Sequence, residues 1–212
     1  ESLTSIANQV LGDNAGSSRA ILVTSTSAAT KQHVVQNNTI SDILGEEGDA
    51  IQFLFYDGVS PTYLNAQGVV SNNHIKNFNR RGVKIQASNV IVLNNTFKNS
   101  LINAEVTNAS SVINVIQSND VSVIGNVLDS SLFVGISVVG ATDAKVNRCR
   151  VTGNTIYGSL TKDAIYFDHC DYGQFDGNVI HEGLRGIAGS NSRYLSISNN
   201  TFYGGTDVNT QF

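Results

Sequence analysis

Apolar and polar positions follow one short pattern that recurs seven times along the chain. An apolar residue stands three positions before an asparagine and another stands two positions after it. The residue just before the asparagine is always Asn or Gly, the types that adopt positive φ at least cost. Each repeat therefore predicts two short strands joined by a one-residue corner. The asparagines recur at intervals of about 22 to 35 residues, the range of a solenoid coil. They are Asn38, Asn73, Asn95, Asn126, Asn154, Asn178 and Asn200.

A second apolar pattern lies between these corners, as pairs spaced by two residues. Ile51 with Phe53, and Val83 with Ile85, are examples. A period of two predicts a strand whose apolar side chains share one face. Each coil should then hold about three short strands. Stacked coils would place each strand about 4.8 Å from its equivalent, and the asparagine corners would form a hydrogen-bonded ladder. The sequence thus predicts an all-β, single-stranded parallel β-helix (solenoid) of about seven coils.

The pattern predicts one elongated domain over residues 20–212, preceded by residues 1–19 as a capping segment or an irregular first coil. In that first segment, Leu3, Ile6, Val10 and Leu11 would suit a short amphipathic helix, and a solenoid end needs cover against edge pairing. Because the chain begins with Glu1, we expect it to be a fragment of a longer chain.

Composition narrows the classes of partner. The 212 residues carry a net charge of −4 with a charged fraction of 14% and no basic stripe, which argues against nucleic acid. No apolar run approaches the roughly 20 residues of a membrane span. Cys149 and Cys170 are too few for a disulfide framework, and Cys149 occupies an apolar position of the repeat. We expect it to be a buried thiol; a disulfide, or a metal site of Cys170 with His169, is a weaker alternative.

Candidate catalytic residues gather in the upper coils. Asp163 and Asp168 lie on one predicted strand, and Arg185 takes the place of Asp163 one coil later, about 5 Å away. Two carboxyl groups can act as acid and base on a glycosidic bond. We therefore predict Asp163 and Asp168 as the catalytic pair, with Glu182 as a further carboxylate. The alternative is a solvated face on which Asp163 pairs with Arg185.

Candidate binding residues lie around the predicted catalytic carboxylates and on a long predicted loop. Tyrosines of the loop could stack on sugar rings or pack the loop onto the barrel, and Tyr157 with Tyr203 should flank His181. An acidic stretch of Glu46, Glu47, Asp49 and Asp57 could hold calcium, but we expect a plain acidic loop and assign no metal or cofactor. The predicted substrate-binding residues are Tyr166, His169, Arg185, His181, Tyr56, Tyr63 and Lys84.

The phrases VVQNNTI, IVLNNTF, RVTGNTI and LSISNNTF resemble those of the pectin-lyase-like right-handed parallel β-helix superfamily, over about residues 20 to 204. The resemblance implies a right-handed coil. It also implies a function among polysaccharide lyases, hydrolases, epimerases and the homotrimeric phage tailspikes that trim host polysaccharide. The segment Tyr166-Phe167-Asp168-His169 is similar to the Tyr, Asp and His cluster of mannuronan epimerases, with Arg185 as a cation, although the spacing is shorter. The catalytic signatures of polygalacturonases are absent.

The resemblance favours a tailspike-type protein, extracellular or on a virion surface, that binds and cleaves a bacterial polysaccharide. A homotrimer would cover a stripe of outward apolar residues. Two alternatives remain open: a non-catalytic shaft or adhesin, and a polysaccharide lyase or uronan epimerase. The stripe consists of Leu22, Leu54, Ile116 and Val139.

Overall fold

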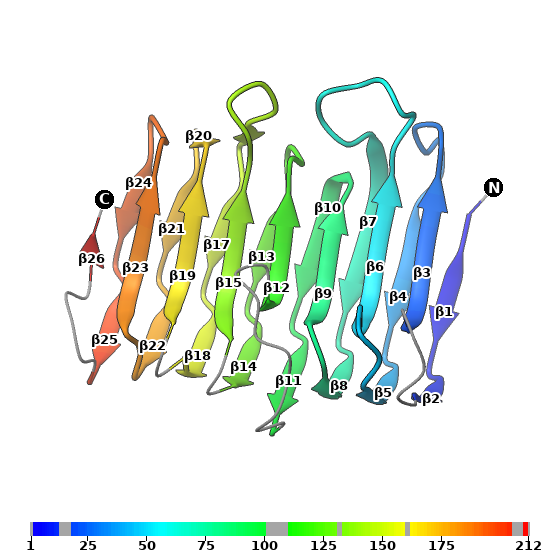
Figure 1. The fold of residues 1–212 in the computed structure, drawn as a ribbon, viewed down its shortest axis with the longest axis horizontal. Helices are drawn as coiled ribbons and strands as arrows, with labels where there is room; N and C mark the ends of the chain where they lie inside the picture. Colours follow the sequence, from blue (N-terminus) through cyan, green and yellow to red (C-terminus); the bar gives the residue numbers. More distant parts are fainter. Residues whose placement is uncertain are drawn as a thin grey trace.

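The chain winds into a parallel β-helix, as the repeat predicts. A computed structural model describes residues 2–12, 18–100, 110–130, 133–159, 162–204 and 210–211. Within these ranges the strands form three long parallel sheets, A, B and C, with the two chain ends at opposite ends of the long axis (Figure 1). None of the described segments is an apolar helix of membrane-spanning length.

The sheets are built from equivalent strands of successive coils, and each coil runs from sheet C to sheet A to sheet B. Sheet A consists of β1 (Thr4–Ile6), β4 (His33–Gln36), β7 (Asn65–Ser71), β10 (Ser88–Leu93), β13 (Ser122–Ile124), β17 (Arg150–Thr152), β21 (Gln174–Asp176) and β24 (Ser196–Ser198). Sheet B consists of β2 (Gln9–Leu11), β5 (Thr39–Ile43), β8 (His74–Phe78), β11 (Thr96–Asn99), β14 (Val127–Ser130), β18 (Thr155–Gly158), β22 (Val179–His181) and β25 (Thr201–Tyr203). Sheet C consists of β3 (Arg19–Ser25), β6 (Asp49–Phe55), β9 (Arg81–Gln86), β12 (Ser111–Ile116), β15 (Val134–Val139), β19 (Asp163–Asp168), β23 (Arg185–Ser190) and β26 (Thr210–Gln211). A short extra pair, β16 (Val146–Asn147) and β20 (Cys170–Asp171), lies between sheets C and A.

The asparagine ladder joins sheet A to sheet B in every coil. We give this name to Asn8 and the seven asparagines of the repeat. Asn126 is typical: its Nδ2 donates to Asn154 Oδ1 at 3.0 Å and to the Val92 carbonyl at 3.0 Å. Its Oδ1 accepts from both the backbone N and the Nδ2 of Asn95. The side chain of Asn126 is fully buried, so the ladder satisfies the polar groups that each corner turns inward.

The corner residue before each ladder asparagine has positive φ, as predicted. Values run from 53° at Asn94 to 64° at Gly153. The first coil follows the same path, since Ala7 has φ 56° and Asn8 Nδ2 donates to Asn38 Oδ1 at 3.0 Å. Residues 4–6 and 9–11 are therefore strands rather than the amphipathic helix considered from the sequence. Pairing with β4 and β5 outweighs the apolar spacing of so short a segment.

The core is a stack of apolar side chains from all three sheets, and like residues lie on like. Ile51, Val83 and Ile113 are in register on sheet C and fully buried. In the neighbouring inward column, which includes Phe53 and Ile85, Gly189 stands where the Phe167 ring takes the space: a Cβ on Gly189 would lie 2.0 Å from that ring. The predicted inward face of sheet C is thus confirmed.

Both cysteines are buried free thiols, as expected for Cys149. Burial raises the pKa of Cys149 and raises that of Cys170 to about 12. Since the thiolate is the reactive form, neither sulfur is suited to nucleophilic chemistry near neutral pH.

Candidate functional site

The outer face of sheet C carries a column of polar side chains. Gln52, Lys84, Asn114, Ser137 and Tyr166 occupy equivalent positions on five successive strands. The column is internally hydrogen-bonded, because Asn114 Nδ2 donates to Ser137 Oγ. Side chains in such a column repeat at the strand spacing of about 4.8 Å. Lys84 and Tyr166 are partly exposed, whereas Gln52, Asn114 and Ser137 are buried.

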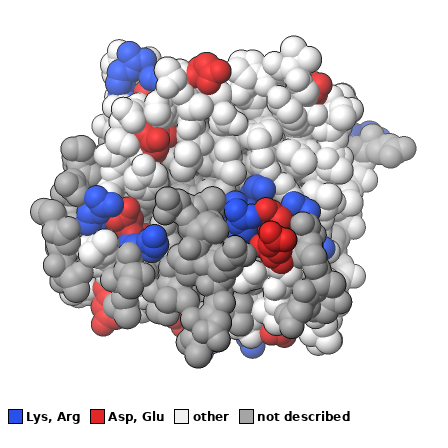
Figure 2. Space-filling view, viewed as in Figure 1, with Lys and Arg blue, Asp and Glu red and all other residues white. Residues whose placement is uncertain are grey.

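A compact group of charges borders the early end of this column. We call it the lower-coil cluster: Arg19, Glu47, Asp49, Arg80, Arg81 and Lys84. Figure 2 shows these basic and acidic side chains gathered over β6 and β9. Asp49 is its centre: the carboxylate is fully buried, with Arg81 Nη1 at 3.0 Å, Lys84 Nζ at 3.7 Å and Arg19 Nε at 3.9 Å. Arg80 donates to Glu47. The buried carboxylate therefore fixes Arg81, which is also buried, and Lys84 and Arg19, which are partly exposed.

Burial is the largest single influence on the pKa values of Asp49, Lys84 and Glu47. Desolvation raises the pKa of Asp49, although the charges of Arg81, Lys84 and Arg19 oppose the change. Desolvation also lowers the pKa of Lys84, with Asp49 opposing. For Glu47, burial acts to raise the pKa, but the charge and hydrogen bond of Arg80 outweigh it and the pKa is lowered. Perturbed groups of this kind concentrate at functional sites, and they also occur in structural ion-pair networks.

Asp163 forms a two-pronged ion pair with Arg185. Its Oδ1 lies 2.6 Å from Arg185 Nε and its Oδ2 lies 2.9 Å from Nη2. Both side chains lie at the start of their sheet C strands, in register as the repeat predicts. The pairing considered as the alternative reading is therefore present, and both carboxylate oxygens of Asp163 already accept hydrogen bonds.

Asp163 and Asp168 are not brought together. They occupy the first and last positions of β19, a fully extended strand. Five residues of extended chain span about 16 Å, whereas the two carboxyl groups of a glycosidase lie about 5 to 9.5 Å apart. The structure therefore does not bring the two carboxyl groups together, and their roles as acid and base stay a prediction. Stacking brings together residues of neighbouring coils, not residues at the two ends of one strand.

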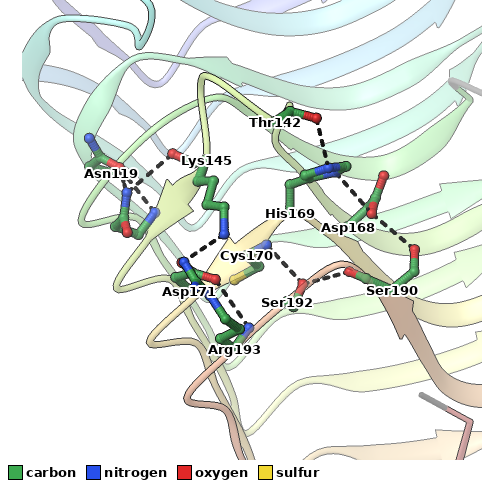
Figure 3. Close-up of polar contacts among 11 residues, drawn as sticks. Asn119, Thr142, Lys145, Asp168, His169, Cys170, Asp171, Ser190, Ser192 and Arg193 are labelled. Atoms are coloured by element: carbon green, nitrogen blue, oxygen red, sulfur yellow. Dashed lines mark hydrogen bonds and ion pairs between the residues drawn. The ribbon is translucent and has the colours of Figure 1, made fainter.

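Asp168 lies instead beside His169 and the following coil. Its Oδ1 accepts from Ser190 Oγ at 2.9 Å and Asn191 Nδ2 at 2.9 Å. His169 Nδ1 is 3.1 Å from the same oxygen, and its Nε2 is 3.3 Å from Thr142 Oγ1 (Figure 3). Burial acts to raise the pKa of Asp168, but these hydrogen bonds outweigh it and lower the pKa. Asp168 is therefore a carboxylate rather than a proton donor.

His181 and Glu182 belong to a different face. His181 lies on β22 of sheet B, stacked between Tyr157 at 4.7 Å and Tyr203 at 4.8 Å, as predicted. Glu182 lies exposed on the turn after β22, with φ 58°, and its backbone N donates to the Tyr203 carbonyl at 2.8 Å. The structure thus separates His181 from the polar column, and Glu182 lies on the turn that leads back to Arg185.

Tyr56 and Tyr63 lie together on the long loop between β6 and β7, seen as the large excursion at one edge of the solenoid (Figure 1). Their rings meet edge to face at 5.5 Å. The Tyr63 hydroxyl accepts from Gln86 Nε2, and Gln86 Oε1 accepts from Gln52 Nε2 at 2.7 Å. Tyr63 is therefore tied to the polar column, which supports its predicted place beside a ligand on sheet C.

The acidic stretch considered for calcium does not converge. Asp57 accepts from Val59 N at 2.9 Å and Ser60 N at 2.8 Å, so it caps its own turn, while Glu47 and Asp49 face arginines. Among the residues that the structure describes, no group of three or more His, Cys, Asp or Glu side chains is placed to hold a metal ion.

A further polar group was not anticipated from the sequence. Asp171 on β20 accepts from Lys145 Nζ at 2.9 Å and from Arg193 Nη2 at 3.1 Å (Figure 3). Burial acts to raise the pKa of Asp171, but the hydrogen bonds from Lys145 and Arg193 outweigh it and lower the pKa. The signal was available: Asp171 and Arg193 each lie seven positions before a ladder asparagine, so the repeat places them side by side in successive coils. The next position along this corner holds Asn89, Asp120, Arg148, Tyr172 and Tyr194 in five successive coils, each with positive φ.

Comparisons with known proteins agree with this architecture. A family model described as "Right handed beta helix region" matches residues 134–212. Two solved structures of the Streptococcus pneumoniae surface protein and adhesin PfbA are similar, each at 17% sequence identity. The first has a TM-score of 0.71 and covers 98% of this chain and 63% of its own; the second has 0.61, 82% and 44%. No curated protein matches the sequence.

At this identity the similarity to PfbA shows the fold alone, and the chain spans less than two thirds of either solved structure. The fold prediction is confirmed in full: the protein is an all-β right-handed parallel β-helix, consistent with the pectin-lyase-like superfamily.

Proposed function

We propose that this protein is a surface-located or secreted β-helix that binds an acidic polysaccharide along the outer face of sheet C. One observation carries the proposal: buried Asp49 holds Arg81 and Lys84 at the edge of the polar column. Cations fixed in this way lose little side-chain entropy when an anion binds, so they are suited to a carboxylated sugar.

The balance of charge favours an acidic ligand. The lower-coil cluster contains four basic side chains and two acidic ones, and one of the acids is fully buried beneath the cations. The polar column adds the partly exposed phenol of Tyr166, which can hydrogen-bond a sugar hydroxyl group, whereas Gln52 and Asn114 are buried beneath the surface. An extended polymer lying along the axis would meet the charged cluster first and the uncharged column next.

The geometry supports binding rather than cleavage. Hydrolysis needs a protonated carboxyl as acid and a second carboxylate within about 5 to 9.5 Å. Asp163 is held by Arg185 at both oxygens, and Asp168 is an ionised carboxylate at the far end of the strand. The adhesin alternative is therefore preferred to a hydrolytic depolymerase of the tailspike type. Similarity in fold to surface adhesins supports a location outside the cell.

The proposal is tested by measuring binding of hyaluronan and alginate, with neutral dextran for comparison, by isothermal titration calorimetry. We expect the wild type to bind an acidic chain and not dextran. Lys84→Gln should weaken that binding roughly tenfold, equivalent to about 1.4 kcal/mol for one charge-assisted contact. Lys98→Gln, on exposed sheet B, is the matched control and should bind as the wild type does.

Equal binding by Lys84→Gln and wild type, with equal melting temperatures, would refute the site on sheet C. The same samples should be assayed for new reducing ends and for ultraviolet absorbance of unsaturated products. We expect neither. Product release that disappears in an Asp163→Asn, Asp168→Asn double variant would replace the adhesin assignment with a depolymerase.

A further inference from the structure

A surface cavity lies on the opposite side of the corner from sheet C, along the outer face of sheet A. Its volume is about 280 Å³, and it is lined by Asp120, Ser122, Arg148, Arg150, Tyr172 and Gln174. Ser122, Arg150 and Gln174 are in register on β13, β17 and β21. Asp120, Arg148 and Tyr172 come from the corner just before those strands. The cavity is thus formed where two outward columns meet.

Tyr172 supplies one flat wall. The ring is 57% exposed and stacks on Tyr194 of the next coil, with centroids 4.8 Å apart and planes within 12°. Arg193 lies over Tyr194, 5.9 Å from its centroid. Tyr172 is therefore supported on one face only. Its other face turns toward the coil that holds Arg148 and toward the cavity.

Arg148 leaves that face of Tyr172 open because it reaches the other way. Its Nε lies 2.6 Å from Asp120 Oδ1 and its Nη2 lies 2.7 Å from Oδ2, one coil further from Tyr172. The neighbouring Arg150 is exposed and forms no salt bridge with any described residue, although its charge helps to lower the pKa of Asp120. The cavity thus combines an uncovered aromatic face with a cation that no carboxylate contacts directly.

We propose that this cavity binds a single carboxylated sugar residue, with the ring on the open face of Tyr172 and the carboxylate on Arg150. A pyranose has an apolar C–H face and a polar rim, which matches one aromatic wall surrounded by hydrogen-bonding groups. Ser122 and Gln174 lie in register on either side of Arg150, so their side chains can bond the sugar hydroxyl groups. The two arginines outnumber the single carboxylate of Asp120, which favours an anionic ligand over a neutral one.

This site is separate from the proposed binding face on sheet C. It uses sheet A and the corner before it, and it shares no residue with the lower-coil cluster or the polar column. Either proposal can therefore fail alone. A ligand bound here would be a terminal or branch residue, because the wall of Tyr172 and Tyr194 ends the cavity on one side.

The test uses methyl β-D-glucuronide as the probe and methyl β-D-glucopyranoside as its neutral counterpart, with binding followed by amide chemical shifts of the whole chain. We expect the glucuronide to bind more tightly and to shift amides of β13, β17 and β21. Tyr172→Asn removes the stacking wall and keeps a residue that accepts positive φ, as Asn89 does at the same corner. It should weaken both glycosides about tenfold, whereas Arg150→Gln should weaken only the glucuronide about tenfold.

Tyr203→Ala is the matched control, since that tyrosine is similarly exposed and stacked but lies on sheet B. It should bind both glycosides as the wild type does. Failure of the wild type to bind the glucuronide at tens of millimolar, or unchanged binding in both Tyr172→Asn and Arg150→Gln, would overturn this site. Neither result would affect the proposed site on sheet C, which is tested separately by the loss of polysaccharide binding in Lys84→Gln.

Discussion

Two corners of the same coil follow opposite rules. The corner between sheets A and B is two residues long in every described coil, and its asparagines bond to one another without interruption from Asn8 to Asn200. The corner between sheets C and A varies from a tight turn to the excursions after β6 and β15 (Figure 1). Its exposed positions hold residues as different as Asp120 and Tyr172, although the backbone keeps positive φ at both.

The corner between sheets A and B stabilises the fold, whereas the corner between sheets C and A is free to carry binding residues. At the first corner the side chain completes the hydrogen bonds of buried backbone groups, so only asparagine serves. At the second corner the stacked backbone sets the conformation whatever the side chain, so residue type is free to change. Both proposed binding sites border sheet C or the corner that follows it, and neither involves the asparagine ladder. We therefore expect binding residues at the positions where the stacked backbone tolerates different residue types.

The largest expected effect comes from cutting the ladder in its middle. Asn126→Ala removes the bonds to Val92 and Asn154 and leaves the buried amide of Asn95 without its acceptor. We expect unfolding free energy to fall by about 4 kcal/mol, since several hydrogen bonds at roughly 1 kcal/mol each are lost and one donor is orphaned. Urea unfolding followed by circular dichroism measures the change.

Arg148→Ala is the control at the variable corner. Both residue types are equally strained at positive φ, and the exposed pair with Asp120 should cost less than about 1 kcal/mol. Similar losses in Asn126→Ala and Arg148→Ala would show that the two corners contribute alike to stability.

We expect Asp49→Asn to lower the unfolding free energy by less than Asn126→Ala does. This variant tests whether residues of the proposed binding face on sheet C also stabilise the fold. The substitution leaves three cations around a buried neutral amide, so we expect a loss of about 3 kcal/mol, as for breaking a buried ion pair. Asp163→Asn breaks a pair in which Arg185 is partly exposed and should cost about 1 kcal/mol. Thermal and urea unfolding of both variants compare them, and a larger loss in Asp163→Asn would contradict this ranking.

The smallest effect concerns the loop after β6. Hydrogen bonds from the Ser60 backbone, the Ser60 hydroxyl and the Val59 backbone lower the pKa of Asp57 to about 2. Because this pKa is depressed in the folded state, the turn is favoured above about pH 4 and that preference is lost as pH falls toward 2. A carboxyl titration by NMR should place the midpoint near 2, and Ser60→Ala should raise it.

Ser27→Ala changes the neighbouring loop and should leave the Asp57 titration as it is. A midpoint near 4 in the wild type would show that the turn is not capped in this way.

The features that could be predicted from the sequence are those that repeat from coil to coil, and the features that were missed do not repeat. The ladder, the positive φ before each asparagine, and the stacks of Asp163 on Arg185 and His181 between two tyrosines all follow from adding one coil to a residue number. The expected proximity of Asp163 and Asp168 is not seen, because the two residues share a strand and are held apart by its length. The cavity at Tyr172 escaped because positive φ is usually signalled by Asn or Gly, and here stacking imposes it on Arg and Tyr.

The amide bonds between ladder asparagines point along the solenoid, so each coil is held by the one before and the one after it. Asn126 has a bonded neighbour on both sides, whereas Asn8 and Asn200 have one each among the described residues. A break in the ladder should therefore loosen the coils on both sides of it first and spread turn by turn. The lower-coil cluster and the cavity at Tyr172 lie on different coils, so local opening at one can release its ligand while the other stays bound.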